Sequence, residues 1–281
     1  MRTAPHRRRS AARRRPIIGA VTAVFVLLLV SAGCASDNGT RAGQRAAGTT
    51  AVDPDLSGSI TVSAAASLTA AFGTIRDDFL AAHPDAQVTL NFGSSGALES
   101  QIETGAPADV AAFADEATMA KLAEQSLLDR PSEIFATNRL VMVAKPGNPK
   151  GIRSLADLAR AGTVSLCAES APCGRYAREI LTAAGASIPE SSITRGQDVR
   201  TTLGAVTEGD ADAAIVYLTD ARAAGSRVST IEIPASQNLE ARYPIAATGA
   251  SRNPVLAQAF LAFVLGSEGQ SVLRDAGFGA P

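Results

Sequence analysis

Small hydroxyl residues stand at turns of the chain where a strand pattern runs into a helix pattern. The first such turn is Ala65-Ala66-Ser67, between an apolar alternation over 60–64 and an amphipathic stretch over 68–79. A turn of small residues leaves the first backbone N–H groups of a helix uncovered, and a serine hydroxyl there can serve either the helix or a ligand. Hydrogen-bond donors gathered in this way are suited to binding an anion.

Three later turns have a similar form. They are Gly93-Ser94-Ser95-Gly96, Pro172-Cys173-Gly174 and Gln197-Asp198, each placed before a helical pattern. Serine after a strand is commonly a helix cap, so Ser67 or Ser95 taken singly is more often a cap than a ligand. The repetition of the turn favours the ligand interpretation.

Strand and helix patterns alternate along the body of the chain, which we take as 58–281. Apolar runs typical of strands occur at 60–64, 88–92, 109–113, 140–143, 164–167, 213–217, 228–233 and 243–247. Helical patterns lie between most of them. This alternation predicts an α/β fold with parallel sheets, and about 224 residues are enough for two such sheets.

The N-terminal residues differ in composition from the body. Residues 1–33 contain seven arginines and no acidic residue, and the apolar run Ile17–Val30 has 14 residues. This run is shorter than the roughly 20 residues of a membrane span and has the order of a secretory signal. Small residues before Cys34 favour a lipoprotein signal with lipid on that cysteine. An ordinary signal peptide or an anchor helix remains an alternative, and the export route stays undecided between general secretion and twin-arginine export.

Residues 34–57 contain no aromatic residue, isoleucine or methionine, so we predict a flexible tether. Without residues 1–33 the chain has 19 basic and 27 acidic residues, a net charge of −8. Nucleic acid is therefore a poor partner. An anion site in such a chain must rely on local dipoles and not on a general positive field.

Enzymatic activity finds little support in the sequence. The stretch 93–97 comes close to the Gly-x-Ser-x-Gly nucleophile elbow of serine hydrolases, but Ala97 replaces the last glycine. A serine nucleophile needs a base, and the only histidine after the signal is His83. The sequence also has no phosphate-binding Gly-x-x-x-x-Gly-Lys loop and no His or Cys cluster with metal spacing. We therefore predict no catalytic residue, no cofactor and no protein-coordinated metal cation.

Five ordered motifs together resemble the molybdate-binding proteins of ABC importers. They lie at 60–69, 92–98, 105–110, 197–200 and 214–217, and the resemblance covers nearly all of 58–281. It implies the two-lobed type II periplasmic-binding-protein fold, with two parallel-rich sheets, helices on both faces and a ligand cleft between the lobes. The implied division is 58–138 plus 246–281 for lobe 1 and 139–245 for lobe 2.

The resemblance also implies the groups that bind the anion. They are three hydroxyls and two backbone amides, from Ser67, Ser95 and Tyr217 and from Cys173 and Val199. Cys173 departs from the family, in which a small residue without a thiol is common. Without the resemblance, Tyr217 is better interpreted as a core tyrosine with its hydroxyl at the surface.

Neighbouring residues receive more ordinary predictions. Asp198 is expected to cap its helix and point away from the anion, and Arg175 and Arg200 are expected to be solvated surface residues. Cys167 and Cys173 remain after lipidation of Cys34. Cysteines outside the cytoplasm tend to pair, so we predict a disulfide between them, with two free buried thiols as the alternative.

The function implied by the resemblance is that of a lipid-anchored, extracytoplasmic receptor. It would bind molybdate, and by extension tungstate, with high affinity and pass the ion to an ABC permease and its ATPase, as a monomer. Molybdate at neutral pH is a dianion without a proton, so it needs hydrogen-bond donors only. The main alternative is another tetrahedral oxyanion, sulfate or phosphate; a receptor that signals without transport and a serine hydrolase are less favoured.

Overall fold

The computed structural model of the protein describes residues 56–281, which belong to one compact unit. The predicted signal sequence, the lipidation site Cys34 and nearly all of the predicted tether lie outside the described residues. Among residues 56–281, no single helix is long and apolar enough to cross a membrane. Helices α7 (Pro254–Leu265) and α8 (Ser267–Ala276), bent by 56° at their junction, pass that test only as a pair.

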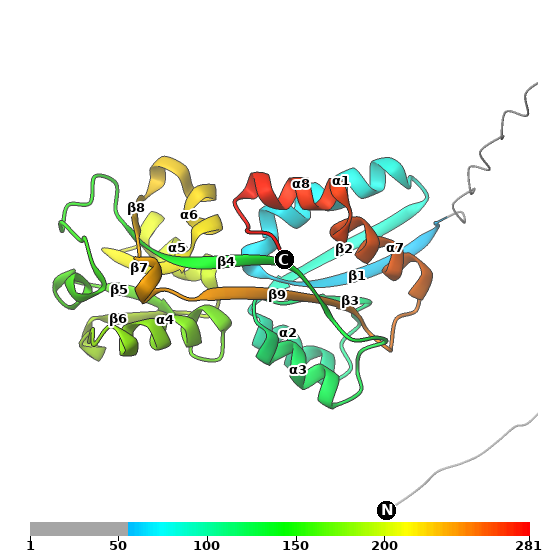
Figure 1. Cartoon of the computed structure of the whole chain (residues 1–281), viewed down its shortest axis with the longest axis horizontal. Coiled ribbons are helices and arrows are strands. Elements are labelled where there is room, and N and C mark those ends of the chain that lie inside the picture. Colours follow the sequence, from blue (N-terminus) through cyan, green and yellow to red (C-terminus); the bar gives the residue numbers. More distant parts are fainter. Residues whose placement is uncertain (1–55) are drawn as a thin grey trace, which may run out of the picture. The chain divides into compact units, whose positions relative to one another are not determined.

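One group of elements, called lobe 1, forms a sheet with helices on both faces (Figure 1). Its parallel strands are β1 (Gly58–Ala65), β2 (Ala86–Gly93) and β3 (Val110–Ala112). One face is covered by α1 (Thr69–Ala82), α7 and α8, and the other by α2 (Ser95–Glu103) and α3 (Glu116–Glu124). The apolar face of α1 packs through Phe72 and Phe79 against Phe260 of α7.

A second group, called lobe 2, has the same construction on a smaller scale. Its strands are β5 (Val164–Cys167), β6 (Ile193–Gly196), β7 (Ala213–Tyr217) and β8 (Ser229–Glu232). Its helices are α4 (Pro172–Ala183), α5 (Val199–Thr207) and α6 (Leu218–Ala224). Strand β5 lies parallel to both β6 and β7. Every residue of β7 is buried, as expected for a central strand with helices on both sides.

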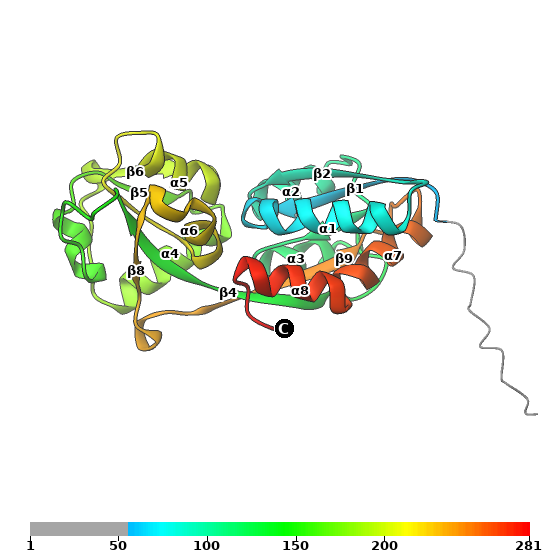
Figure 2. The same cartoon turned by 90° about the horizontal axis from the view of Figure 1, so that it is seen from above.

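Two long strands join the lobes, as Figure 2 shows for β4. Strand β4 (Glu133–Ala144) pairs with β9 (Glu240–Ala247) as far as Arg139, and from Leu140 onward it pairs with β7 and β8. The strand path is β2-β1-β3-β9-β4-β7-β5-β6, with β8 beside β4.

The predicted two-lobed α/β fold is confirmed, but the strands of residues 56–281 form one mixed nine-stranded sheet where two parallel-rich sheets were expected. The pairings of β4 with β7, β8 and β9, and of β9 with β3, are antiparallel. The chain leaves lobe 1 along β4 and returns along β9, so two adjacent crossing strands must run in opposite directions. The antiparallel pairing of β4 with β9 therefore follows from a chain that visits lobe 1 twice.

Candidate functional site

Each lobe brings its predicted ligand residues to the carboxyl ends of neighbouring parallel strands. In lobe 1, Ser67 follows β1 and Ser95 follows β2. In lobe 2, Cys173 comes after β5, Val199 comes after β6 and Tyr217 ends β7. In open α/β sheets this end of the strands is where ligands bind.

All five predicted residues line one small cavity with a volume of ≈ 10 Å³. The rest of its wall consists of Ala65, Ala66, Gly93, Ser94, Ala114, Ala171, Pro172 and Asp198. Pockets for drug-sized ligands are larger, about 300–1,000 Å³. The cavity is therefore far too small for a drug-sized ligand, and both lobes contribute to its wall.

Neither predicted serine acts as a helix cap. The cap of α2 is Ser94, whose Oγ accepts a hydrogen bond from the Ala97 N–H at 3.3 Å. Ser67 lies in a single turn, Ala66–Leu68, and makes no capping bond. The capping interpretation of these two hydroxyls is therefore wrong.

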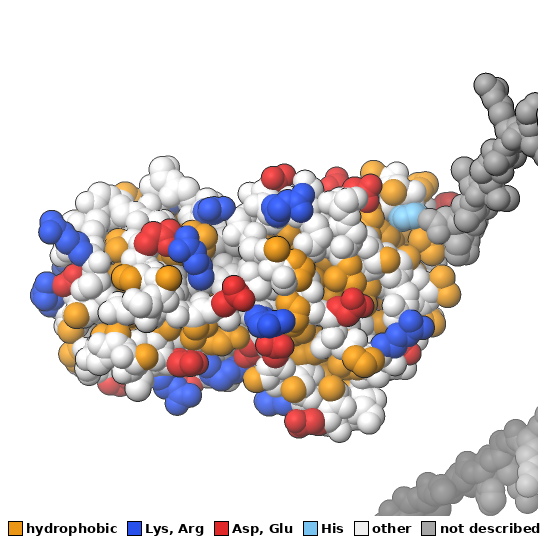
Figure 3. Space-filling model, viewed as in Figure 1, with side chains coloured by type: hydrophobic (Ala, Val, Ile, Leu, Met, Phe, Trp, Pro, Cys, Tyr) orange, Lys and Arg blue, Asp and Glu red, His pale blue; other side chains and the backbone are white. Residues whose placement is uncertain are grey.

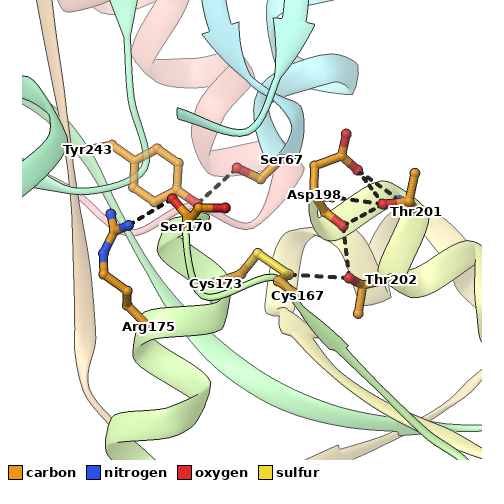
Figure 4. Close-up of a disulfide and its surroundings, with 9 residues drawn as sticks. All are labelled: Ser67, Cys167, Ser170, Cys173, Arg175, Asp198, Thr201, Thr202 and Tyr243. Carbon is orange, nitrogen blue, oxygen red and sulfur yellow. Dashed lines mark hydrogen bonds between the residues drawn. A yellow bond between two sulfur atoms is a disulfide. The ribbon is translucent and has the colours of Figure 1, made fainter. Parts of the chain in front are cut away.

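The oxygen of each serine already accepts or can accept a hydrogen bond from protein. Ser95 is 1% exposed, and its Oγ accepts from the Ala114 N–H at 3.0 Å. Ser67 Oγ lies 3.0 Å from the hydroxyl of Tyr243 (Figure 4). A hydroxyl that accepts such a bond still has its own hydrogen available to donate.

Tyr217 is buried, and its hydroxyl has no hydrogen-bond partner among residues 56–281. Its ring packs edge-on against Tyr243, with ring centroids 5.9 Å apart. Burial raises the pKa of Tyr217 well above its ordinary value, so the hydroxyl stays protonated at neutral pH. The interpretation of a core tyrosine with a surface hydroxyl is wrong, because the hydroxyl is buried in the wall of the cavity.

The two predicted amide donors lie in the first turns of helices. Cys173 is the second residue of α4, after Pro172, and Val199 is the first residue of α5. The N–H groups of a first helical turn have no acceptor inside the helix, and the helix dipole makes this end favourable for an anion. A disulfide joins Cys173 to Cys167, the last residue of β5, and so links the start of α4 to the sheet (Figure 4).

Two carboxylates lie close to the lobe 2 side of the site. Asp198 caps α5 and accepts from the Thr201 N–H at 2.8 Å, which confirms the predicted capping role. Asp220 of α6 is buried, and burial raises its pKa to about 7. A carboxyl with this pKa is neutral in a large fraction of molecules at pH 7, which weakens its repulsion of an anion.

The face shown in Figure 3 has no extended basic area that could attract an anion, because positive and negative side chains are interspersed on it. Arg200 is exposed, as predicted. The prediction for Arg175 is wrong. Its guanidinium forms an ion pair with Asp115, donates to Thr118 Oγ1 at 2.9 Å, and is only 31% exposed.

The Arg175 ion pair joins the two lobes, since Asp115 and Thr118 belong to α3 and its cap. The backbones approach closely nearby. A Cβ on Gly96 of α2 would lie 2.5 Å from the carbonyl oxygen of Ser170, in the loop before α4. Glycine is therefore required at position 96 for the lobes to meet as they do here.

A hydrolytic centre does not assemble around Ser95. The one histidine in the described part of the chain, His83, packs its ring against Phe79 at a centroid distance of 4.7 Å. The hydrogen bond recorded at Ser95 Oγ comes from a backbone amide, which cannot act as a base. Residues 56–281 contain no group of three His, Cys, Asp or Glu side chains that could hold a metal ion.

Sequence reasoning missed a group of buried residues that form hydrogen bonds with the site residue Ser67 and with one another. Asn138 on β4, Tyr243 on β9 and Thr219 at the start of α6 form a buried hydrogen-bonded group with Ser67. Tyr243 is 176 positions away from Ser67 in the chain. No local pattern connects such distant positions, so only the folded arrangement identifies them.

Residues 60–279 match the family model described as bacterial extracellular solute-binding protein, and the chain belongs to this family. Among its relatives, the molybdate-binding protein ModA of Mycobacterium tuberculosis (strain H37Rv) is 37% identical over 264 residues, covering 94% of this chain and 97% of the relative.

Two solved structures share the fold. The sulfate-binding protein SubI of Mycobacterium tuberculosis H37Rv has a TM-score of 0.70 and 25% identity, covering 78% of this chain and 86% of that one. The periplasmic molybdate-binding protein of Azotobacter vinelandii has a TM-score of 0.72 and 22% identity, covering 79% of this chain and 99% of that one. The fold alone therefore does not distinguish one oxyanion from the other.

Proposed function

We propose that this protein is an extracytoplasmic receptor that binds molybdate and delivers it to an ABC import permease and its ATPase. Two findings support molybdate as the ligand. A relative named as a molybdate-binding protein is 37% identical over nearly the whole chain. The cavity wall also presents hydroxyls and helix-terminal amides, which match an oxyanion that carries no proton.

The observation that carries this proposal is the buried hydroxyl of Tyr217 without a partner. Leaving a buried hydroxyl unpaired costs about 1–3 kcal/mol, so native proteins rarely do so without a reason. An oxyanion in the cavity supplies the acceptor that the hydroxyl lacks. The proposed ligand groups are the hydroxyls of Ser67, Ser95 and Tyr217 and the amides of Cys173 and Val199.

Because these groups come from both lobes, full coordination requires the lobes to be closed on the ion. Ligand binding then shifts the population toward the closed form, which the permease recognises. We propose lobe boundaries at the crossing strands, near Asn138–Leu140 in β4 and Tyr243–Ala246 in β9.

Sulfate is the second candidate, because it is also a dianion and a sulfate-binding protein shares the fold. It is smaller than molybdate, so discrimination depends on how tightly the lobes close. Phosphate carries a proton near neutral pH, and a site that offers only donors leaves that O–H unpaired, at a cost of about 1–3 kcal/mol.

A thermal shift panel on the compact unit 51–281 tests the ligand. A ligand that binds only the folded state stabilises it by RT ln(1 + [L]/Kd), about 4 kcal/mol at a thousandfold excess over Kd. We expect the largest shifts with molybdate and tungstate, a smaller one with sulfate and almost none with phosphate. A larger shift with sulfate or phosphate would overturn the substrate, and no shift with any of them would overturn the anion site.

The membrane arrangement is a separate part of the proposal. We propose that residues 1–33 are removed, that Cys34 carries lipid, and that residues 34–57 tether a monomeric receptor to the outer face of the cell membrane. In the full chain, Cys34→Ser should move the protein from the membrane fraction to the medium. Unchanged membrane association would indicate another anchor. Permease and ATPase genes beside this one would favour transport over a purely signalling role.

A further inference from the structure

A chain of buried hydrogen bonds connects the crossing strands to the cavity. Tyr243 Oη lies 3.0 Å from Ser67 Oγ, and Asn138 Nδ2 lies 3.4 Å from Tyr243 Oη. The same amide nitrogen is 2.9 Å from Thr219 Oγ1 in lobe 2. All four side chains are buried, from Tyr243 at 0% to Ser67 at 8% exposed. Only Ser67 belongs to the proposed ligand groups.

The side-chain amide of Asn138 determines which groups donate and which accept in this series of hydrogen bonds. Its Oδ1 accepts from the Arg139 N–H at 2.9 Å, which turns its nitrogen toward Thr219 and Tyr243. An amide nitrogen only donates, so the Tyr243 oxygen accepts. The O–H of Tyr243 then needs an acceptor of its own, and the Ser67 oxygen at 3.0 Å is in position to accept it. The hydrogen of Ser67 is left for the cavity.

The opposite direction leaves a buried group unsatisfied. If Ser67 donated to Tyr243, the Tyr243 oxygen would accept from both Ser67 and Asn138, and its own hydrogen would have no acceptor among these residues. Burial raises the pKa of Tyr243 above its ordinary value, so this hydroxyl keeps its proton. Ser95 Oγ likewise accepts a hydrogen bond, because its partner, the Ala114 N–H, can only donate.

We propose that Asn138 and Tyr243 are positioning residues that hold the Ser67 hydroxyl as a hydrogen-bond donor, and that they thereby make the site select oxyanions without a proton. The inference rests on the proposed function. A protonated oxyanion brings an O–H that needs an acceptor. Ser67 accepts from Tyr243 and turns its own hydrogen toward the cavity, so it presents a donor to the ligand there.

The test compares sulfate with phosphate, because these two ions are close in size and differ in the proton. Affinities of the unit 51–281 for molybdate, sulfate and phosphate are measured by calorimetry at pH 6 in wild type and Tyr243→Phe. The variant removes the O–H that orients Ser67, so the Ser67 hydroxyl can rotate and accept a hydrogen bond from the ligand. We expect weaker molybdate and sulfate binding and a sulfate-to-phosphate affinity ratio that falls by about tenfold, the value of one redirected hydrogen bond.

Three further variants test whether the change in the sulfate-to-phosphate affinity ratio acts through the Ser67 hydroxyl. In a Ser67→Ala background, Tyr243→Phe should leave the ratio unchanged, because the hydroxyl that it orients is gone. Asn138→Asp offers Tyr243 an acceptor in place of a donor and should lower the ratio in the same direction, which serves if Tyr243→Phe does not fold. Tyr176→Phe removes a tyrosine hydroxyl outside this hydrogen-bonded group and should not change the ratio.

The outcomes separate this inference from the proposed function. If wild type prefers molybdate and sulfate to phosphate but Tyr243→Phe and Asn138→Asp keep the same ratio, the positioning role is wrong and the proposed function stands. A change of equal size in the Ser67→Ala background also overturns it. If wild type binds none of the three ions, both proposals fail.

Discussion

The two walls of the cavity are built from different kinds of donor. Among the proposed ligand groups, lobe 1 contributes the side-chain hydroxyls of Ser67 and Ser95, which are hydrogen-bonded to Tyr243 and to the Ala114 amide. Lobe 2 contributes two backbone amides at the starts of α4 and α5, and one tyrosine hydroxyl. The lobe 1 wall is thus made by side chains, and the lobe 2 wall largely by backbone.

This difference decides how each wall responds to mutation. A side-chain donor is removed by a substitution that leaves the backbone unchanged, so its loss should be local and limited to one hydrogen bond. A backbone donor survives substitution of its own side chain, and it is lost only when the helix start is displaced. Four predictions follow this contrast, in order of decreasing effect on oxyanion affinity.

Gly174→Ala should have the largest effect, because it displaces the lobe 2 backbone. A Cβ on Gly174 would collide with the carbonyl oxygen of Ala168 and would lie 2.8 Å from that of Cys167. The first turn of α4, with the Cys173 amide, must then move. We expect molybdate affinity to fall by about a hundredfold or more in calorimetric titration.

The matched control for this substitution is Gly204→Ala in α5. A Cβ at position 204 meets nothing within 4 Å, and alanine favours a helix by about 0.5–1 kcal/mol over glycine. Affinity should therefore stay at the wild-type value while stability rises slightly. Equal affinity losses in both variants would contradict the importance of the α4 backbone.

Ser95→Ala should come next, because it removes one hydroxyl donor from the lobe 1 wall. A hydrogen bond to a charged group contributes about 1.5–3 kcal/mol, so affinity for every oxyanion should fall by about tenfold to a hundredfold. Ser100→Ala is the control: it removes an exposed hydroxyl of the same helix that does not line the cavity, and it should change neither affinity nor stability appreciably. The prediction fails if the two variants exchange these effects.

Arg175→Met should have a smaller effect, because Arg175 joins the walls without lining the cavity. It removes the ion pair with Asp115 and the bond to Thr118. The closed arrangement loses an interlobe contact, so we expect a few-fold weaker affinity, seen mainly as faster dissociation in stopped-flow measurements. Arg178→Met, which removes an exposed arginine of the same helix, should dissociate like wild type. Unchanged dissociation in Arg175→Met would argue against this contact holding the lobes together.

The sequence predicted some elements of the fold and missed others. Continuous apolar runs mark buried strands such as β7, and small residues after a strand mark helix starts, so the alternation of elements and the placement of Ser67 were predictable. Strand β6 was missed because it lies at the edge of the sheet and two of its four residues, Thr194 and Arg195, are exposed. An edge strand of this kind carries no apolar pattern for sequence reasoning to detect.

Side-chain partners far apart in the chain were also beyond sequence reasoning. An arginine such as Arg175 is usually solvated, and its pairing with Asp115 exists only because α3 and α4 come together. The hydrogen bond between Ser67 and Tyr243 depends in the same way on the return of β9 to lobe 1. Local patterns thus predict which groups can bind, whereas the fold determines which way those groups point.

The smallest effect on affinity is expected when both disulfide cysteines are replaced. The proposed donor at position 173 is the backbone amide, which Cys167→Ala/Cys173→Ala retains, and Pro172 still starts α4. The cross-link closes a short loop, so its loss should lower the unfolding free energy by about 2 kcal/mol through the entropy of the unfolded chain. We therefore expect a lower midpoint in thermal unfolding and a molybdate affinity within about twofold of wild type. An affinity loss as large as that of Ser95→Ala would mean that the disulfide, and not the helix start alone, holds the Cys173 amide in place.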